Sequence, residues 1–313
     1  MLAAPGEELG DALGVPARTL ANLRATYGSL RADGEAVKVY ALSGRVLRLL
    51  GPMLGGKPLA YEAFYNWMAP KGIGYLNTQA RGEPALFDLI YNSLLADLIP
   101  TYDALYFETD ANEQYFGYNG EYTHVLQKTH RDTKLFWDIE SSDIQLIGMH
   151  GSMLLDVERS AQTYAFLFGL TPATATFYAT LVRDALLQSQ TMNGGNHPLF
   201  SFNAFAASFG GPYPDKIVMG DGIMAGYEDV GFGDVAPQAI YAHEFAHHIQ
   251  FANGYFEDPL ATEGDPPEQT RYTELMADAM SAYYLTHKRG AAMNRKRVEQ
   301  FLEVFFQIGD CAF

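Results

Sequence analysis

The chain has 313 residues, of which 48% are hydrophobic and 13% aromatic, a composition that excludes a disordered chain and is typical of a globular protein with a sizeable core. Its formal net charge of −16 disfavours nucleic acid as a partner, because binding to phosphates needs a basic surface. A single cysteine, Cys311, excludes an internal disulfide framework.

The first hundred residues carry mainly helical patterns. Apolar residues at three- and four-residue steps predict a helix over residues 17–50, and a second helix over 81–98 that ends before Pro100. Residues 101–122 are rich in Tyr, Phe, Asn and Gly, which predicts short strands and turns. The Asn-Gly pair at residues 119–120 is a turn signal.

The middle of the chain predicts one strand and two helices. Residues 143–149 read as a strand. The uncharged run between Arg159 and Arg183 is broken by Gly169 and Pro172. That interruption favours two buried helices over a transmembrane segment.

The C-terminal third has the clearest signals. Residues 216–219 predict a short apolar strand, followed by a glycine-rich loop as far as Asp234, which can cap the next helix. That helix is expected from residue 235 to 253, ending at a glycine. Another runs from Asp265 to near residue 290, and an amphipathic helix follows it.

Residues 242–250, AHEFAHHIQ, hold three of the chain's eight histidines and one glutamate. His243 and His247 are four residues apart on a predicted helix, so both rings lie on one face and can bind one zinc ion. Glu244 lies about 100° further round the helix, where it can act as general base toward a water activated by the metal. The spacing predicts a catalytic site with one zinc ion per chain.

A third ligand is expected on the helix that follows. Gln250 and Asn253 stand where the metzincin motif needs glycine and histidine, which excludes that class. Glu274 is the favoured third ligand, because Asp278 lies four residues later on the same helix face. Asp278 can accept the ring N–H of a ligating histidine and so fix its tautomer. Other acids beside the intervening loop remain candidates: Glu257, Asp258, Glu263 and Glu268.

The two segments together resemble a known group of enzymes. HEFAHHIQ, followed by ELMADAMSAYY at residues 274–284, looks like the gluzincin arrangement of thermolysin-type peptidases. It is more similar still to the bacterial putative neutral zinc metallopeptidases, whose helices read roughly HE-x-GH-x-x-Q and EL-x-AD. The C-terminal IGDCAF also resembles that family, so the resemblance covers residues 216–313. Ala246 and Ala279 depart from the family's usual glycine and frequent cysteine, and neither is a ligand.

The resemblance implies a zincin-like catalytic half that hydrolyses peptide or protein substrates with zinc. The strand at 216–219 would be an edge strand, along which an extended peptide adds by backbone hydrogen bonds. A donor for the developing oxyanion is also needed. Its candidates are Tyr272, Tyr283, Tyr284 and His287.

The complete sequence predicts an α+β protein that is predominantly helical. We expect a helical N-terminal region of unknown role at residues 1–135 and a zincin-like metallopeptidase region at 136–313. The N-terminus has no basic residue before Arg18 and no apolar core of signal-peptide length. The resemblance to exported bacterial proteins nevertheless favours an extracytoplasmic location, with the signal segment absent from this chain, over a cytoplasmic one. No feature predicts the oligomeric state.

Two other functions use the same residues. A zinc-stabilised binding module without catalysis is one alternative, because the first 215 residues resemble no known family. A di-iron carboxylate protein is the other: Glu244 and His247 form one half of its motif, and Glu121 and His124 a second copy. Both halves would need to lie on long bundle helices, and Glu121 follows a predicted turn.

Overall fold

The computed structural model describes residues 38–41, 96, 98–189, 192–209, 213–229, 231–258 and 266–308, with the backbone alone for 38–41, 266–270 and 303–308. These residues form an α+β protein that is predominantly helical, as predicted. The strands are β1 (Lys38–Ala41), β2 (Gln145–Met149), β3 (Ala204–Ser208) and β4 (Lys216–Gly220). The longer helices are α8 (Thr123–Phe136), α9 (Val157–Phe168), α10 (Pro172–Gln188), α11 (Asp221–Asp229), α12 (Ala236–Asn253), α14 (Pro266–Thr286) and α15 (Arg295–Ile308). Shorter helical turns are α7 (Leu98–Tyr102), η2 (Asp103–Phe107), η3 (Gly151–Leu155), η4 (Asn193–Gly195), η5 (Pro198–Phe200) and η6 (Tyr255–Glu257).

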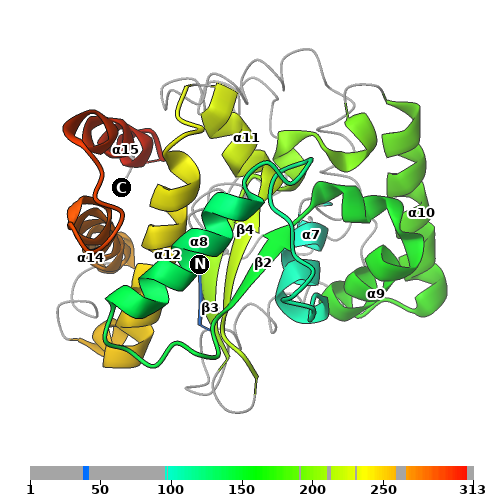
Figure 1. The fold of residues 1–313 in the computed structure, drawn as a ribbon. Coiled ribbons are helices and arrows are strands. Elements are labelled where there is room, and N and C mark those ends of the chain that lie inside the picture. Colours follow the sequence, from blue (N-terminus) through cyan, green and yellow to red (C-terminus); the bar gives the residue numbers. More distant parts are fainter. Residues whose placement is uncertain are drawn as a thin grey trace.

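The four strands form one mixed sheet in the order β1-β3-β4-β2 (Figure 1). Strand β3 is antiparallel to β1 and β4, and β2 is parallel to β4. The prediction that residues 216–219 form an edge strand is therefore wrong, since β4 is paired on both sides. Its complete burial is what a central strand requires, because helices cover both faces of the sheet.

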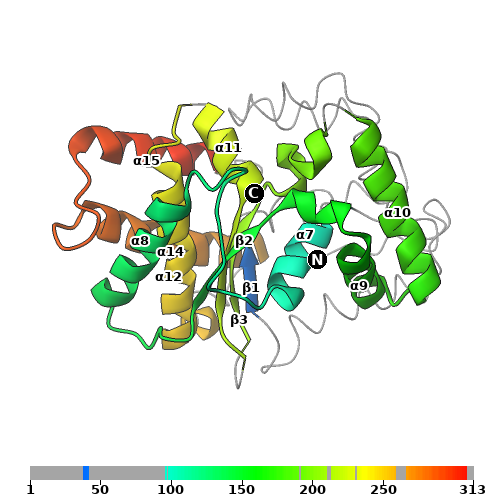
Figure 2. The same ribbon diagram turned by 45° about the vertical axis from the view of Figure 1, so that its right-hand side comes forward.

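Side chains of alternate residues enter two different cores, as the two-residue period of a strand demands. Leu146, Ile217 and Met219 face a core that includes Ile240 and Phe245 of α12. The neighbouring positions Ile147, Met149 and Val218 face Ala104 and Leu105 of η2 on the other side of the sheet. In Figure 2 the sheet stands between α8, α12 and α14 on one side and α7 and α9 on the other.

Helix α12 is buried along almost its whole length, from Ala236 to Gln250. One face packs on the sheet and α8, while Val235, Ala239 and Ala242 pack against α14 and α15. The helix ends at Gly254, which has a φ of 66° that suits glycine, and its N–H bonds back to Gln250 and Phe251. Polar side chains on such a buried helix usually have hydrogen-bond partners, so any polar atom that lacks one is notable.

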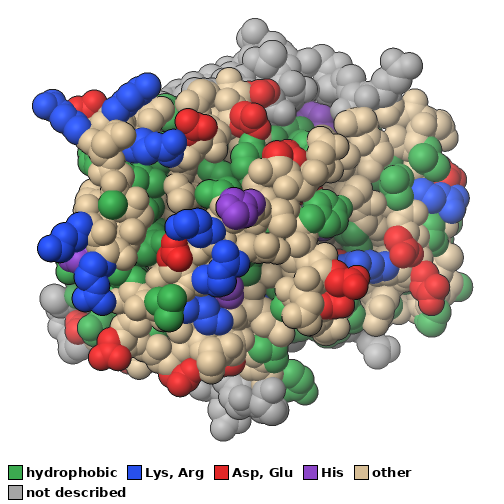
Figure 3. All heavy atoms as spheres, in the orientation of Figure 1, with side chains coloured by type: hydrophobic (Ala, Val, Ile, Leu, Met, Phe, Trp, Pro, Cys, Tyr) green, Lys and Arg blue, Asp and Glu red, His purple; other side chains and the backbone are tan. Residues whose placement is uncertain are grey.

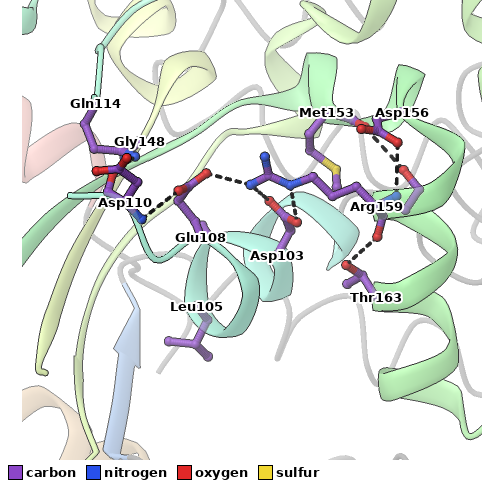
Figure 4. A network of polar contacts seen from close by, with 12 residues as sticks. Asp103, Leu105, Glu108, Asp110, Gln114, Gly148, Met153, Asp156, Arg159 and Thr163 are labelled. Carbon is purple, nitrogen blue, oxygen red and sulfur yellow. Dashed lines mark hydrogen bonds and ion pairs between the residues drawn. The ribbon is translucent and has the colours of Figure 1, made fainter. Parts of the chain in front are cut away.

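A charged network ties the helical hairpin of α9 and α10 to the sheet (Figure 4). Arg159 Nε donates to Asp103 Oδ1 at 2.6 Å, and its Nη2 donates to Glu108 Oε2 at 2.8 Å. Lys216 of β4 is 5% exposed, and its ammonium donates to the carbonyls of Ala104, Leu105 and Glu108 at 3.2, 2.8 and 2.6 Å. Burial lowers the pKa of Lys216 to about 8.

Several elements match the sequence predictions. The strand near 143–149 and the two helices on either side of Gly169 and Pro172 are confirmed. The helix predicted from 235 is confirmed as α12, although its N-cap residue is Val235 without a side-chain cap. Asp234 instead accepts a contact from Arg297 of α15.

Other predictions were wrong. Pro100 lies in the first turn of α7, where its missing N–H costs no hydrogen bond, and residues 101–107 are helical rather than extended. Residues 108–122 form turns, including the one predicted at 119–120. The segment after β4 begins with α11 rather than a loop. Gly222 lies so close to the Pro198 carbonyl that a side chain there would clash. The helices predicted over 17–50 and 81–98 lie outside the described residues, apart from Lys38–Ala41, which is a strand, and Ala96 and Leu98.

The surface in view carries charges of both signs. Figure 3 shows Lys and Arg side chains gathered over α8 and α15, with Asp and Glu side chains interspersed among them. Such mixing is typical of a solvated protein surface. None of the described helices is long and apolar enough to cross a bilayer.

Candidate metal centre

Three predicted ligands converge between α12 and α14. His243, His247 and Glu274 are 1%, 0% and 4% exposed, and one ligand atom from each lies within 4.8 Å of the others. The two Nε2 atoms are 3.1 Å apart. Glu274 Oε2 lies 3.3 Å from His243 Nε2, and its Oε1 lies 4.0 Å from His247 Nε2. This buried group could hold a metal ion.

These separations suit a small tetrahedral ion. Two ligand atoms that are each about 2.0–2.1 Å from one tetrahedral ion lie about 3.3 Å apart. The separations of 3.1 and 3.3 Å are close to that figure, while the 4.0 Å separation needs a small shift of Glu274. Two imidazoles and one carboxylate also form the donor set expected at a catalytic zinc site, with one position left for water.

Both histidines have a partner on the other ring nitrogen. His243 Nδ1 lies 2.8 Å from Asp278 Oδ1, as the sequence placed it. His247 Nδ1 lies 2.7 Å from Gln250 Oε1, a contact that the sequence reasoning missed. Gln250 is three residues after His247, which puts it on the same helix face, and it matches the final glutamine of HE-x-GH-x-x-Q. Partners of this kind orient the ring and leave Nε2 to bind a metal.

Glu244 is the most unusual residue of the group. It is 0% exposed, and neither carboxylate oxygen has a hydrogen-bond partner of normal geometry. Burial raises its pKa to about 8, and the neighbouring Glu274 acts in the same direction. His243 and the backbone N–H of Ala206 favour the charged form but do not outweigh burial. A buried carboxylate without partners costs several kcal/mol, so a nearby cation or water would stabilise it considerably.

The charges around the histidines favour a cation. Burial lowers the pKa of His247 to about 4. Burial acts the same way on His243, but hydrogen bonds to Asp278 and Glu274 outweigh it and raise the pKa of His243 to about 10. Three carboxylates thus surround two imidazoles in a buried space. A metal ion can take the place of the proton that these carboxylates favour, because ligands bind in their deprotonated forms.

His248, the third histidine of the motif, points elsewhere. Its Nε2 lies 3.0 Å from the carbonyl oxygen of Lys216, and its Nδ1 lies 3.4 Å from Asp215 Oδ2. It follows His247 by one residue, which turns it about 100° around the helix toward the sheet. His248 therefore anchors α12 to the start of β4 rather than joining the ligand group.

The proposed oxyanion donors are spread along α14. Tyr283 is 54% exposed and lies against Trp137, with ring centroids 5.8 Å apart, while His287 lies 5.3 Å from Phe136. Tyr284 is 2% exposed and packs in the core between α12 and α15. At 1.5 Å per residue these three lie about 13–20 Å along the helix axis from the position of Glu274. Of the four, only Tyr272, half-buried two residues before Glu274, stays in the same turn.

The remaining candidate ligands lie elsewhere or outside the described side chains. Within the described residues, the group that could hold a metal includes neither Glu257 nor Asp258. Glu263 and Glu268 lie outside the described side chains. The second half of the di-iron motif does not join the group either. Glu121 precedes α8, and its carboxylate accepts the N–H of Asn119 in the turn.

The comparisons with known proteins found no match: no protein-family model, no curated protein and no solved structure is detectably similar to the chain. The function must therefore be argued from the site itself.

Proposed function

We propose that this protein is a zinc-dependent peptidase in which His243, His247 and Glu274 hold the metal and Glu244 is the general base. The donor set of two imidazoles and a carboxylate suits zinc. A bound zinc ion would supply a water of lowered pKa and a Lewis acid for the scissile carbonyl. Asp278 would hold the His243 ring in the orientation that presents Nε2 to the metal.

The observation that carries this proposal is the complete burial of Glu244 beside the three ligands. Neither of its carboxylate oxygens has a hydrogen bond of normal geometry within the described residues, and the Ala206 backbone N–H and His243 do not outweigh the cost of burial, so a purely structural site gains little from it. A general base needs a pKa near the working pH, and burial raises the pKa of Glu244 to about 8. Its carboxylate can take a proton from the attacking water and pass it to the leaving amine.

One specific observation favours the second candidate function, a zinc-stabilised module without catalysis. His243, Glu244, His247 and Glu274 are all at most 4% exposed. Structural zinc sites are closed, whereas catalytic sites keep a position open for water or substrate. A peptidase would need a conformation in which substrate reaches this centre, whereas a zinc-stabilised module would not. Peptide cleavage by the zinc-loaded protein distinguishes the two functions.

The deciding experiment is Glu244→Gln in the full chain. The substitution keeps the shape of the side chain but removes the ability to accept a proton. We expect zinc content near one per chain and a loss of peptide hydrolysis of at least about a hundredfold. Because a buried ionisable carboxyl group is replaced by a neutral amide of the same shape, the melting temperature should stay the same or rise.

The exposed Glu299→Gln, on α15, is the matched control and should leave hydrolysis unchanged. Wild-type activity in the Glu244→Gln variant would show that Glu244 is not the base. Full zinc occupancy in the wild type, together with no cleavage of any peptide in a mixed library, would support the non-catalytic module.

A further inference from the structure

Gln250 joins the two helices that carry the ligands. It lies on α12, is 0% exposed, and uses both ends of its amide. Its Oε1 lies 2.7 Å from His247 Nδ1, and its Nε2 donates to the carbonyl oxygen of Thr273 on α14 at 2.6 Å. Thr273 directly precedes Glu274, so one side chain contacts a ligand on α12 and the backbone beside a ligand on α14.

The chemistry of these partners determines the direction of every bond. A backbone carbonyl oxygen can only accept, so the amide nitrogen of Gln250 must face Thr273. The amide oxygen then faces His247 and requires a proton on Nδ1. A neutral imidazole with its proton on Nδ1 has its lone pair on Nε2, the atom that lies 3.1 Å from His243 Nε2. The carbonyl of Thr273 thus selects the tautomer of His247 through Gln250.

We propose that Gln250 is a positioning residue that holds His247 in its metal-binding tautomer and keeps Glu274 in register with it. The inference rests on the proposed metal centre. Free histidine prefers the proton on Nε2, so without Gln250 the neutral ring would favour the form that cannot bind a metal through Nε2. The hydrogen bond to Thr273 helps to place Glu274, the next residue, because it limits sliding of α14 along α12.

A neutral amide suits this position better than a carboxylate would. Glu244, Glu274 and Asp278 already surround the two rings, and His243 already has a carboxylate partner in Asp278. A second carboxylate at position 250 would add a buried negative charge and would meet the Thr273 carbonyl with two acceptors facing each other. The amide satisfies both neighbours without adding charge.

A merely structural role for Gln250 makes a different prediction. If Gln250 only satisfies the Thr273 carbonyl, its removal should lower stability and leave the His247 tautomer unchanged. If Gln250 selects the tautomer, its removal should move the His247 proton from Nδ1 toward Nε2 even in a protein that remains folded.

The test uses the metal-free full chain with ¹⁵N-labelled histidine at neutral pH, where long-range ¹H–¹⁵N spectra identify the protonated ring nitrogen. We expect wild-type His247 to carry its proton on Nδ1, and Gln250→Met to show a large share of the Nε2-protonated form. Zinc affinity, measured by competition with a chelator, should fall by about 10–100-fold in Gln250→Met. Asn253→Met is the matched control, because the side chain of Asn253 donates to the Ile249 carbonyl of the same helix and, within the described residues, contacts neither ligand. It should change neither readout.

Gln250→Glu keeps an acceptor for His247 but cannot donate to Thr273, so it should retain the Nδ1 proton while zinc affinity falls. A pure Nδ1 tautomer with wild-type zinc affinity in folded Gln250→Met would overturn the proposal. Should Gln250→Met fail to fold, Gln250→Glu decides, and a mixed tautomer there would overturn it equally. The tautomer is read without metal or substrate, so its outcome is independent of whether the wild type cleaves peptides.

Discussion

The two carboxylates of α14 should differ in their effect on metal affinity. Asp278 contacts the ring of His243 at Nδ1, on the far side from Nε2, so it acts on a metal only through the ring. Loss of such a partner weakens metal binding by about 10–100-fold, or about 1.4–2.7 kcal/mol. Because the Asp278 side chain is 33% exposed, water can replace it in Asp278→Ala, and we expect a value near tenfold.

Glu274→Ala should be more damaging. It removes the carboxylate whose oxygens lie 3.3 and 4.0 Å from the two Nε2 atoms, and it leaves two imidazoles as the only protein ligands. A site with two protein ligands should lose zinc to mild chelators that leave Asp278→Ala loaded. The expected order of zinc loss is therefore Glu274→Ala first, Asp278→Ala second and the wild type last.

Competition with chelators of graded affinity measures this order, with circular dichroism to check the fold. Asp132→Ala is the control, because Asp132 has a 40% exposed side chain and forms its one ion pair among the described residues with Lys128 on α8. A larger defect in Asp278→Ala than in Glu274→Ala would reverse the two roles. Unchanged zinc affinity in both variants would refute the assignment of this centre.

Three further predictions concern stability and exchange. Arg159→Ala leaves Asp103, 3% exposed, without its arginine partner and should lower the free energy of unfolding by about 3 kcal/mol in denaturant titrations. Its control is Arg183→Ala, because Arg183 is equally exposed and, within the described part of the chain, pairs only with the adjacent Asp184; this variant should lose under about 1 kcal/mol. Similar losses in the two variants would refute the network. Between pH 8 and 10.5 the unfolded chain keeps a proton at Lys216 that the folded chain loses. The free energy of unfolding of the wild type, compared with that of Lys216→Met, should therefore rise by about 3 kcal/mol over this pH range. A difference that does not change with pH would contradict the lowered pKa of Lys216. Because the ligands are at most 4% exposed, stopped-flow release of zinc should reach a rate that no longer increases with chelator concentration, whereas a linear increase would indicate an open centre.

The parts of the centre that lie on one helix could be predicted from the sequence. The spacing of His243, Glu244 and His247 fixes which side chains share a face, because the period of the helix is constant. The same rule placed Asp278 on the same face of α14 as Glu274. In the structure this face of α14 meets the histidine face of α12, with 2.8 Å between His243 Nδ1 and Asp278 Oδ1. Local periodicity was sufficient because each prediction spans at most one or two turns.

Contacts between elements were harder to predict. The sequence showed Gln250 as a residue that breaks the metzincin motif and matches the final position of HE-x-GH-x-x-Q, but not its contact with Thr273, which depends on the register of α14 against α12. The strand β4 was recognised but misplaced at an edge, because its neighbour β3 is an alanine-rich segment with little strand signal. Tyr283 and Tyr284 were equally good candidates in the sequence. In the structure both rings pack on Phe136, at the end of α14 that lies away from Glu274.

Helix α12 gives three neighbouring histidines three different surroundings. His243 meets a carboxylate, His247 an amide and His248 a backbone carbonyl of the sheet, so each ring is oriented by at least one hydrogen-bonding partner. Glu244 lies among them, and neither of its carboxylate oxygens has a hydrogen bond of normal geometry within the described residues. A fold that provides partners for three buried histidines could as readily accommodate an apolar residue at position 244. A carboxylate at this position suits the proposed chemistry with a metal and a water, and it is the reason we propose hydrolysis rather than a purely structural zinc site.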